Sequence, residues 1–507
     1  MSVNQLKAGA ILSYVSIALT NVIALLYTPY MLRMMGKSEF GLYSLAASIV
    51  AYLTVLDLGF GNAIIRYTSK FRAEGKLDEQ YKMFGMFFVL YVIIGVFTII
   101  VGSFLLFNID NLFSISMTSE ETDKLKIMVI LMIFNLAFTF PMSIWGAVIT
   151  AYEDFIFQKI VNIVRIILNP VVMIIMLEMG YRAVGMVVVT TIFNVLTLSI
   201  NCWYCLFKLK IKVRFGKFDF RFLKEVAIYS LWIFLTAIVD RIYWSSGQFV
   251  LGILKGSAAV AVYAVAIQLE KIYMSFSTAI SGVFLPRVTG LVVKNHNSKE
   301  ISDIFIRVGR IQYAIIIYIL VGFVVFGLPF IQFWAGKTYE DAYWITLCIF
   351  IPLTVPIIQS MGVIILQAKN QMKFRSLLYL FISILGLIIS IPMTKLYGAI
   401  GCAVGIALSL ILGQIICMNI YYYKKIEIDI PKFWKEILKM TYLPFLFCIL
   451  FLLFFKYYPI DSILELVIGI IVFSFLYLPL SWFFQLNKSE QILISSPIRS
   501  LISKFKK

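Results

Sequence analysis

Apolar residues run along this chain in long stretches that short polar loops separate. A helix needs about 20 mostly apolar residues to cross the hydrocarbon core of a bilayer. Fourteen stretches approach that length, at about residues 8–30, 41–65, 83–107, 125–150, 160–179, 184–207, 226–253, 259–291, 308–334, 343–368, 376–394, 399–421, 441–455 and 462–484. The pattern predicts an all-α, polytopic membrane protein with about 14 transmembrane helices.

The composition supports this interpretation. Hydrophobic types make up 61% of the 507 residues and charged types 14%, whereas a soluble domain is about 45–50% apolar and about 25% charged. A soluble core stops growing beyond ~250–300 residues, so it could not bury this much apolar surface. A soluble enzyme, a secreted disulfide scaffold and a disordered protein are excluded.

The positive charges fall mainly on one side of the predicted membrane. With the N-terminus inside, inward segments hold 30 Lys and Arg residues and outward segments hold 8. Basic residues accumulate in cytoplasmic loops, so both termini are predicted to be cytoplasmic. The net charge of +18 does not indicate nucleic acid, because no basic stretch is followed by a domain large enough to fold alone.

The chain also resembles itself. Gly36 and Tyr43 recur as Gly256 and Tyr263, and a similar pair of segments precedes the sixth and twelfth spans. Six spans per copy give both copies the same orientation, as in transporters with parallel repeats. The predicted organisation is a six-helix bundle (1–210), a basic cytoplasmic linker (211–225), a second six-helix bundle (226–423), a cytoplasmic loop (424–440), an extra helical pair (441–484) and a basic cytoplasmic tail (485–507).

Five of the ionisable residues within the predicted spans stand out, on spans two, seven and eight. Asp240 and Arg241 are about fifteen residues into span seven, Glu270 and Lys271 are near the middle of span eight, and Asp57 is in the inner half of span two. Such residues cost ~2.5–3.5 kcal/mol each in hydrocarbon and usually face a bundle interior or water. They are the candidate substrate-binding residues.

Trp244 and Gln248 join this set because they share a helical face with Arg241, at i, i+3 and i+7. The favoured interpretation is a hydrated cavity that holds a polar, anionic substrate between the two bundles. The alternative is a pair of ion pairs that only join spans seven and eight. Neutralised charge alone does not explain the polar positions beside the charges, so the cavity is favoured.

Other candidate chemistry is sparse. Cys202 and Cys205 form a C-x-x-C pattern at the end of an apolar helix, and His296 is the only histidine. No metal site and no cofactor are predicted. Arg310 is expected to extend to the headgroups, and the tail 485–507 is expected to lie on anionic inner-leaflet lipids.

A family resemblance rests on the first two spans. The pattern there reads Gly36-x-x-x-Phe40-Gly41-x-Tyr43, Asp57-x-Gly59 and Gly61-Asn62-Ala63-x-x-Arg66. It resembles the polysaccharide-transporter branch of the multidrug/oligosaccharidyl-lipid/polysaccharide (MOP) exporter superfamily, the Wzx-like flippases. The family usually has Tyr in place of Phe40. The likeness covers about residues 5–423, and the extra helical pair resembles the members with fourteen spans.

The resemblance implies a function and a location. Such proteins move undecaprenyl-diphosphate-linked oligosaccharides across the bacterial cytoplasmic membrane by alternating access, for surface polysaccharide or teichoic acid assembly. It also implies a possible coupling ion, H+ or Na+, and possible polysaccharide-assembly membrane proteins as partners. Relatives that flip the peptidoglycan precursor carry an arginine cluster in the first-bundle cavity. Spans one and two have no mid-depth arginine, which favours a glycan repeat unit as substrate.

Two other functions compete with this one. A cation-coupled multidrug exporter would share the fold but would need acidic residues in a drier pocket. A polytopic glycosyltransferase or polymerase would need a sizeable outward loop with catalytic residues, and the longest outward loop here, 108–124, is short. The sequence therefore favours a transporter that is not an enzyme.

Overall fold

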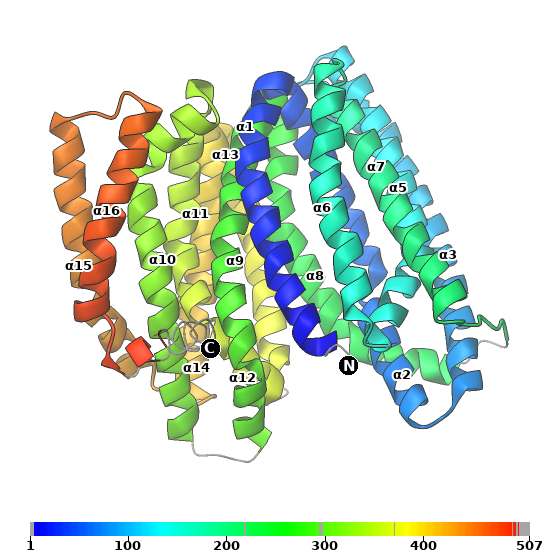
Figure 1. Ribbon diagram of the computed structural model, residues 1–507. Helices are drawn as coiled ribbons and strands as arrows, with labels where there is room; N and C mark the ends of the chain where they lie inside the picture. The colour runs from blue at the N-terminus through cyan, green and yellow to red at the C-terminus, as the bar shows by residue number, and fades with distance from the viewer. Residues whose placement is uncertain are drawn as a thin grey trace, which may run out of the picture. The chain divides into compact units, whose positions relative to one another are not determined.

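The computed structural model describes residues 5–216, 220–293, 298–369, 371–488, 490–492 and 495. Nearly all of these residues are helical and no strand occurs among them, as Figure 1 shows. The all-α prediction is confirmed. The chain packs as two compact units, Met1–Ala264 with Leu387–Cys402, and Val265–Gly386 with Ala403–Lys507. The predicted bundle boundaries at residues 210 and 226 stay a prediction.

The first unit is built mainly from the N-terminal helices. They are α1 (Gln5–Leu53), the 3-10 turn η1 (Thr54–Asp57), α2 (Phe60–Ala73), α3 (Leu77–Phe107), the short α4 (Ile109–Phe113), α5 (Ser119–Ala151), α6 (Phe155–Glu178), α7 (Ala183–Trp203), the π-helical η2 (Tyr204–Lys208), α8 (Phe220–Lys255) and the start of α9 (Ser257–Val293). Helix α5 packs against α3 on one side and α7 on the other (Figure 1). Helix α6 packs against α1 and α7.

The second unit continues from the rest of α9. Its other elements are α10 (Ser298–Trp334), η3 (Lys337–Tyr339), α11 (Asp341–Ile358), α12 (Ser360–Ala368), most of α13 (Met372–Ser409), the π-helical η4 (Leu410–Cys417), α14 (Met418–Lys424), α15 (Ile430–Tyr457) and α16 (Ile463–Phe484). Within this unit α10 packs against α11, α15 and α16.

Two glycines explain why fewer continuous helices than spans occur. Eleven helical segments of the described chain are long and apolar enough to cross a membrane. Two of them each cover two predicted spans, because Gly36 (φ 77°) and Gly398 (φ 61°) turn the chain inside α1 and α13. Glycine adopts positive φ without the steric cost of a Cβ atom. With α8 added, the described helices account for the fourteen predicted spans.

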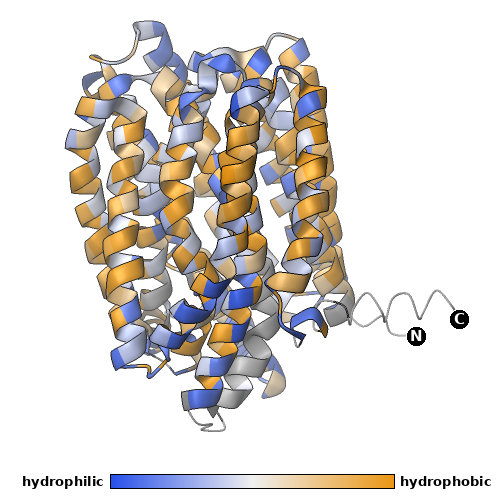
Figure 2. Ribbon diagram, turned by 90° about the vertical axis from the view of Figure 1, so that its left-hand side faces the viewer, coloured by the Kyte–Doolittle hydropathy of each residue, from blue (hydrophilic) through white to orange (hydrophobic). Residues whose placement is uncertain are grey.

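The helix surfaces fit a lipid environment. On α16 the buried residues Leu466, Gly469, Phe473 and Tyr477 follow one helical face, whereas Phe475 on another face is 77% exposed. Figure 2 shows apolar residues along the helices and hydrophilic residues near their ends. Exposed apolar side chains at this density would not be stable in water, but they are the normal surface of a membrane protein.

Arg310 differs from its expected position. Its side chain does not extend away from the protein, because Arg310 is only 7% exposed. Its Nε donates to Glu490 Oε1 at 2.7 Å, and an NH group donates to Glu436 Oε2 at 2.9 Å. The guanidinium also donates to the carbonyl oxygen of Gln485 at 3.0 Å. Two carboxylates therefore neutralise this arginine inside the protein and join α10 to α15 and to the segment after α16.

The predicted tail on anionic lipids cannot be followed to its end. Residues 496–507 lie outside the described residues, so its lipid contact stays a prediction.

The buried charges of Arg310 predict a large loss of stability on truncation. Arg310→Ala leaves the buried carboxylate of Glu490 without its cation, whereas Glu436 keeps Lys439 at 2.6 Å. The uncompensated charge of Glu490 should lower the free energy of unfolding by about 3–5 kcal/mol. Denaturant unfolding of the detergent-purified protein measures this. Lys432→Ala is the matched control, because Lys432 pairs with Asp303 at 2.8 Å in an exposed position and should matter far less. Equal effects of both variants would contradict a stabilising role for the buried ion pairs of Arg310.

Candidate functional site

The second predicted span is interrupted at the point where its aspartate lies. After α1 the chain makes the 3-10 turn η1, then Leu58 (φ 54°) and Gly59 (φ 74°) adopt left-handed conformations before α2 begins at Phe60. Non-helical backbone at membrane depth is tolerated only where protein or a water-filled cavity surrounds it. The interruption therefore marks a specialised region inside the first unit.

Asp57 is fixed by a tyrosine from a neighbouring helix. The hydroxyl of Tyr91, on α3, donates to Asp57 Oδ1 at 2.8 Å. Tyr91 is fully buried, and its ring stacks on Phe140 with centroids 6.3 Å apart. Asp57 itself is half-buried. Tyr91 thus fixes one oxygen of the carboxylate, while Asp57 keeps part of its surface accessible.

Helix α8 runs antiparallel beside this interrupted span. Tyr52 hydrogen-bonds to Ser246 above the interruption, and Tyr67 donates to Glu225 at 2.8 Å below it. A helix rises 1.5 Å per residue, so Asp57 lies at the level of about residues 239–241 of α8. The structure therefore brings Asp57, Asp240 and Arg241 to a similar depth in the first unit.

The predicted polar face of α8 is partly accessible. Arg241, Trp244 and Gln248 are half-buried, and Asp240 is exposed. The Nε of Arg241 is buried without a hydrogen-bond partner among the described residues. Arg241 also forms no ion pair with any carboxylate in that part of the chain. An arginine at this depth with open donors can accept an anionic group.

Glu270 and Lys271 lie on the part of α9 that belongs to the second unit. Glu270 is 1% exposed and Lys271 is exposed. The polar face that continues along α9 is packed at Ser277, which donates to the carbonyl oxygen of Ile357 at 3.0 Å and lies 3.1 Å from the side-chain amide of Gln312 on α10. The pairing of Glu270 and Lys271 with the charges of α8 stays a prediction.

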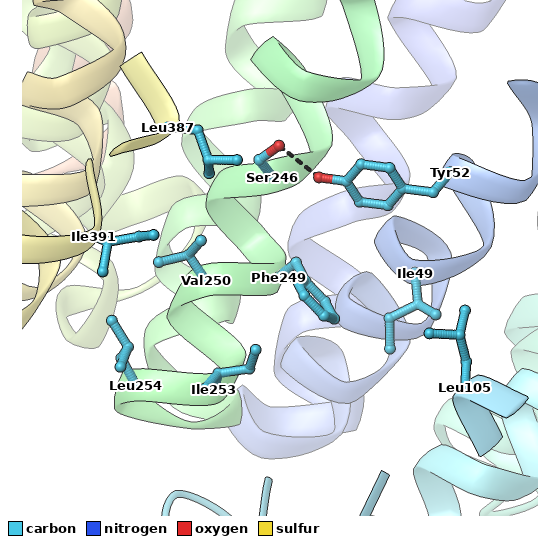
Figure 3. A pocket seen from close by; sticks show the side chains of 10 residues that line it. All are labelled: Ile49, Tyr52, Leu105, Ser246, Phe249, Val250, Ile253, Leu254, Leu387 and Ile391. Atoms are coloured by element: carbon cyan, nitrogen blue, oxygen red, sulfur yellow. Dashed lines mark hydrogen bonds between the residues drawn. The ribbon is translucent and has the colours of Figure 1, made fainter. Parts of the chain in front are cut away.

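A cavity in the first unit lies close to the α8 face but is apolar. It has a volume of about 500 Å³. Ten side chains line it, Ile49, Tyr52, Leu105, Ser246, Phe249, Val250, Ile253, Leu254, Leu387 and Ile391, and Figure 3 shows the bonded pair Tyr52–Ser246 among them. None of the predicted site residues lines it. Sequence reasoning missed this face of α8, although Ser246, Phe249 and Ile253 recur at helical spacing.

The matched loops of the internal repeat meet in the structure. A Cβ atom on Gly41 would lie 1.9 Å from the carbonyl oxygen of Ser257. Ser38 and Ser257 both donate to Glu121 Oε1, at 2.5 and 2.6 Å. We call Ser38, Gly41, Glu121 and Ser257 the outer closure, since the charge count assigns this end of the helices to the outside.

The described residues offer few ligands for a metal ion and few reactive thiols. The described residues contain no group of three or more His, Cys, Asp or Glu that could hold a metal ion. Cys202 and Cys205 are free thiols, and Cys205 is buried with its thiol against the carbonyl oxygen of Trp145. His296 lies outside the residues that the structure describes.

Comparison with known proteins identifies the family. The model of the polysaccharide biosynthesis protein family matches residues 6–292, more than half of the chain. The chain belongs to this family. A Shigella flexneri protein named as an O-antigen transporter is 21% identical over 80% of this chain and 94% of its own length. The uncharacterized membrane protein EpsK of Bacillus subtilis (strain 168) is 18% identical over 78% of each chain.

Solved structures confirm the fold. The lipid II flippase MurJ in an inward closed conformation superposes with a TM-score of 0.68, at 17% identity, over 93% of this chain and 99% of that one. An inward-facing multidrug resistance MATE transporter of the MOP superfamily gives 0.65, at 16% identity, over 81% and 99%. These likenesses confirm the predicted fold, and the chain is a multi-pass membrane protein.

The contact between Tyr91 and Asp57 predicts a measurable cost of removing one hydroxyl. Tyr91→Phe should lower the free energy of unfolding by about 1.5–3 kcal/mol, the usual range for a hydrogen bond to a charged group. Tyr30→Phe is the control, because its hydroxyl binds Glu178 at an exposed position. Thermal unfolding in detergent compares the two variants. A Tyr91→Phe protein as stable as the control would contradict a stabilising hydrogen bond between Tyr91 and Asp57.

Proposed function

We propose that this protein moves a lipid-linked oligosaccharide, of the undecaprenyl-diphosphate type, from the cytoplasmic to the outer leaflet of a bacterial cytoplasmic membrane. The product would serve surface polysaccharide or teichoic acid assembly. The main support is the family match over residues 6–292, and the name of the Shigella flexneri relative points to the same class of substrate. Both termini are proposed to be cytoplasmic, and the protein is proposed to be a transporter and not an enzyme.

Each proposed substrate-binding residue has a role that follows from the chemistry of its side chain. Arg241 and Lys271 would bind the diphosphate or acidic sugars, since a guanidinium forms paired hydrogen bonds with phosphate oxygens. Trp244 and Gln248 would contact sugar rings and hydroxyls. Asp57, Asp240 and Glu270 would balance charge or bind a coupling ion, H+ or Na+. A glycan repeat unit is proposed rather than the peptidoglycan precursor.

Transport by alternating access would require the outer closure to open. The closure joins the turn inside α1, the start of α5 and the start of α9 through Glu121. Glu121 is only half-buried, so water can replace the two serine hydroxyls when they leave its carboxylate, and the contacts can alternate between formed and broken. The interruption at Leu58 and Gly59 offers a second place where the chain can bend without unravelling a helix.

Reconstituted protein tests the transport function directly. Proteoliposomes with lipid-linked oligosaccharide from the host should show time-dependent access of that lipid to an external glycan-cleaving enzyme. Arg241→Gln with Lys271→Gln should slow this by about tenfold or more, since lost charged contacts typically exceed ~1.4 kcal/mol. Lys255→Gln with Lys337→Gln removes two exposed lysines and should leave the rate unchanged. Equal rates for the two double variants would remove the assignment of Arg241 and Lys271.

A multidrug exporter is the rival function, favoured by the likeness of fold to the MATE transporter. The open cation Arg241 argues against a cationic drug as substrate, because like charges repel. Cells that express the protein should therefore grow no better than control cells on ethidium and other cationic dyes. Resistance to these dyes, together with no movement of lipid-linked glycan, would replace the proposed function with drug export.

The close approach at Gly41 predicts that a single methyl group opens the outer end. In Gly41→Ala the Cβ atom would clash with the backbone of Ser257, so a cysteine at Ser246 should react faster with an external, membrane-impermeant maleimide. The measurement uses a background without the six native cysteines. Gly61→Ala is the control, because nothing lies within 4 Å of its Cβ position. Equal labelling rates in the two variants would contradict the outer closure.

A further inference from the structure

Three helices of the first unit carry polar stripes that the sequence analysis did not use. On each helix the positions fall on one face, at spacings of three, four and seven residues. The stripes are Asn135, Thr139, Ser143, Gly146 and Thr150 on α5; Gln158, Asn162, Arg165 and Asn169 on α6; and Thr190, Asn194, Thr197 and Asn201 on α7. The opposite face of α6 is apolar and exposed, with Ile160 at 49% and Val164 at 47%. The stripe on α6 therefore faces away from the lipid side.

Hydrogen bonds join the three stripes. Asn194 donates to Asn135 Oδ1 at 2.7 Å and to Thr139 Oγ1 at 2.8 Å, and its own oxygen accepts from Arg165 at 3.3 Å. Further along, Gln158 donates to the carbonyl oxygen of Gly146 at 3.3 Å. The stripes thus form one polar tract between α5, α6 and α7.

Arg165 brings a positive charge to the middle of this tract. It is near the centre of α6, a 24-residue helix, and it forms no ion pair in the part of the chain that the structure describes. Its one hydrogen-bond partner there is the neutral amide of Asn194. Along α6 the nearest carboxylates are Asp154 and Glu178, eleven and thirteen residues away, which is about 16 and 20 Å at 1.5 Å per residue.

The tract also keeps hydrogen-bonding capacity open. Asn169 lies one turn beyond Arg165, and its Oδ1 is buried without a partner among the described residues, as is Oδ1 of Asn201. Asn162, one turn before Arg165, is half-buried, as are Arg165 and Asn194, so water-sized space reaches these side chains. A membrane-embedded cation with no counter-charge and with amide groups on both sides is incomplete without an anion.

We infer that Arg165 is the centre of an anion-binding site within the first unit, which takes a diphosphate group. The planar guanidinium binds two phosphate oxygens at once, and the amide groups of Asn162 and Asn169 flank it. The site does not suit Na+, because no carboxylate accompanies the arginine. Under the proposed function, on which this assignment of the ligand rests, the diphosphate is that of the lipid-linked substrate, and Arg165 provides a second anion contact besides Arg241.

Binding measurements on the full-length protein in nanodiscs test the site. The probes are inorganic diphosphate and undecaprenyl diphosphate, and microscale thermophoresis measures the affinity of each. Arg165→Gln removes the charge but can still donate to Asn194, so it should weaken binding by about tenfold or more, and Arg165→Lys should weaken it less. Lys159→Gln is the matched control, because it removes a charge from the same helix off the stripe. Wild-type affinity in a folded Arg165→Gln protein would overturn the inference and leave Arg165 a purely structural bond to Asn194.

A second measurement needs no variant. Phenylglyoxal modifies arginine side chains, and mass spectrometry reports the rate at each one. Diphosphate should slow modification of Arg165 severalfold, and the absence of protection would overturn the site. Binding of inorganic diphosphate alone would support the anion site and remove its assignment to the lipid-linked substrate. Binding of diphosphate without movement of glycan in proteoliposomes would instead reject the proposed function and keep the site.

Discussion

Hydrocarbon offers no hydrogen-bond partner, so every polar group within a membrane must find its partner in the protein or in water that the protein admits. The structure answers this constraint in two ways. Arg310 is closed off by Glu436 and Glu490, and such a group stabilises one packing of the helices. Arg165 and Arg241 form no ion pair in the described chain. A charge without an ion pair at membrane depth is destabilising, and a ligand of opposite sign would stabilise it.

The breaks in the helices follow the same constraint. Gly36 and Gly398 lie between predicted spans, where water can satisfy the freed backbone groups. The break at Leu58 and Gly59 lies within a span, beside a carboxylate that Tyr91 fixes. A break of this kind leaves backbone groups without helical partners. It therefore persists only where neighbouring helices or water satisfy these groups. The interruption lies at the level of the polar residues Asp240 and Arg241 of α8, which fits this requirement.

The outer closure and the polar tract differ in strength as well as in place. Glu121 holds two serines of separate loops at one carboxylate oxygen, a contact that can break without leaving a charge buried. The tract between α5, α6 and α7 is a connected network of amides, which keeps three helices in register. A transporter needs both kinds of contact. Some contacts must form and break between its conformations, and a rigid group of helices must keep the binding residues together during that conformational change.

The local sequence pattern determined the spans, the all-α class and the family resemblance. About twenty apolar residues in a row form a transmembrane helix in a bilayer, and Gly36 permits the turn between two such helices. The pattern also located Asp57 and Arg241 at membrane depth. Only the tertiary structure decided the partner of each polar group. Arg310 meets Glu490 across 180 residues of sequence and Asp57 meets Tyr91 across 34. Such pairings depend on which helices become neighbours, and the spacing along a single helix holds no information about the helix that will face it.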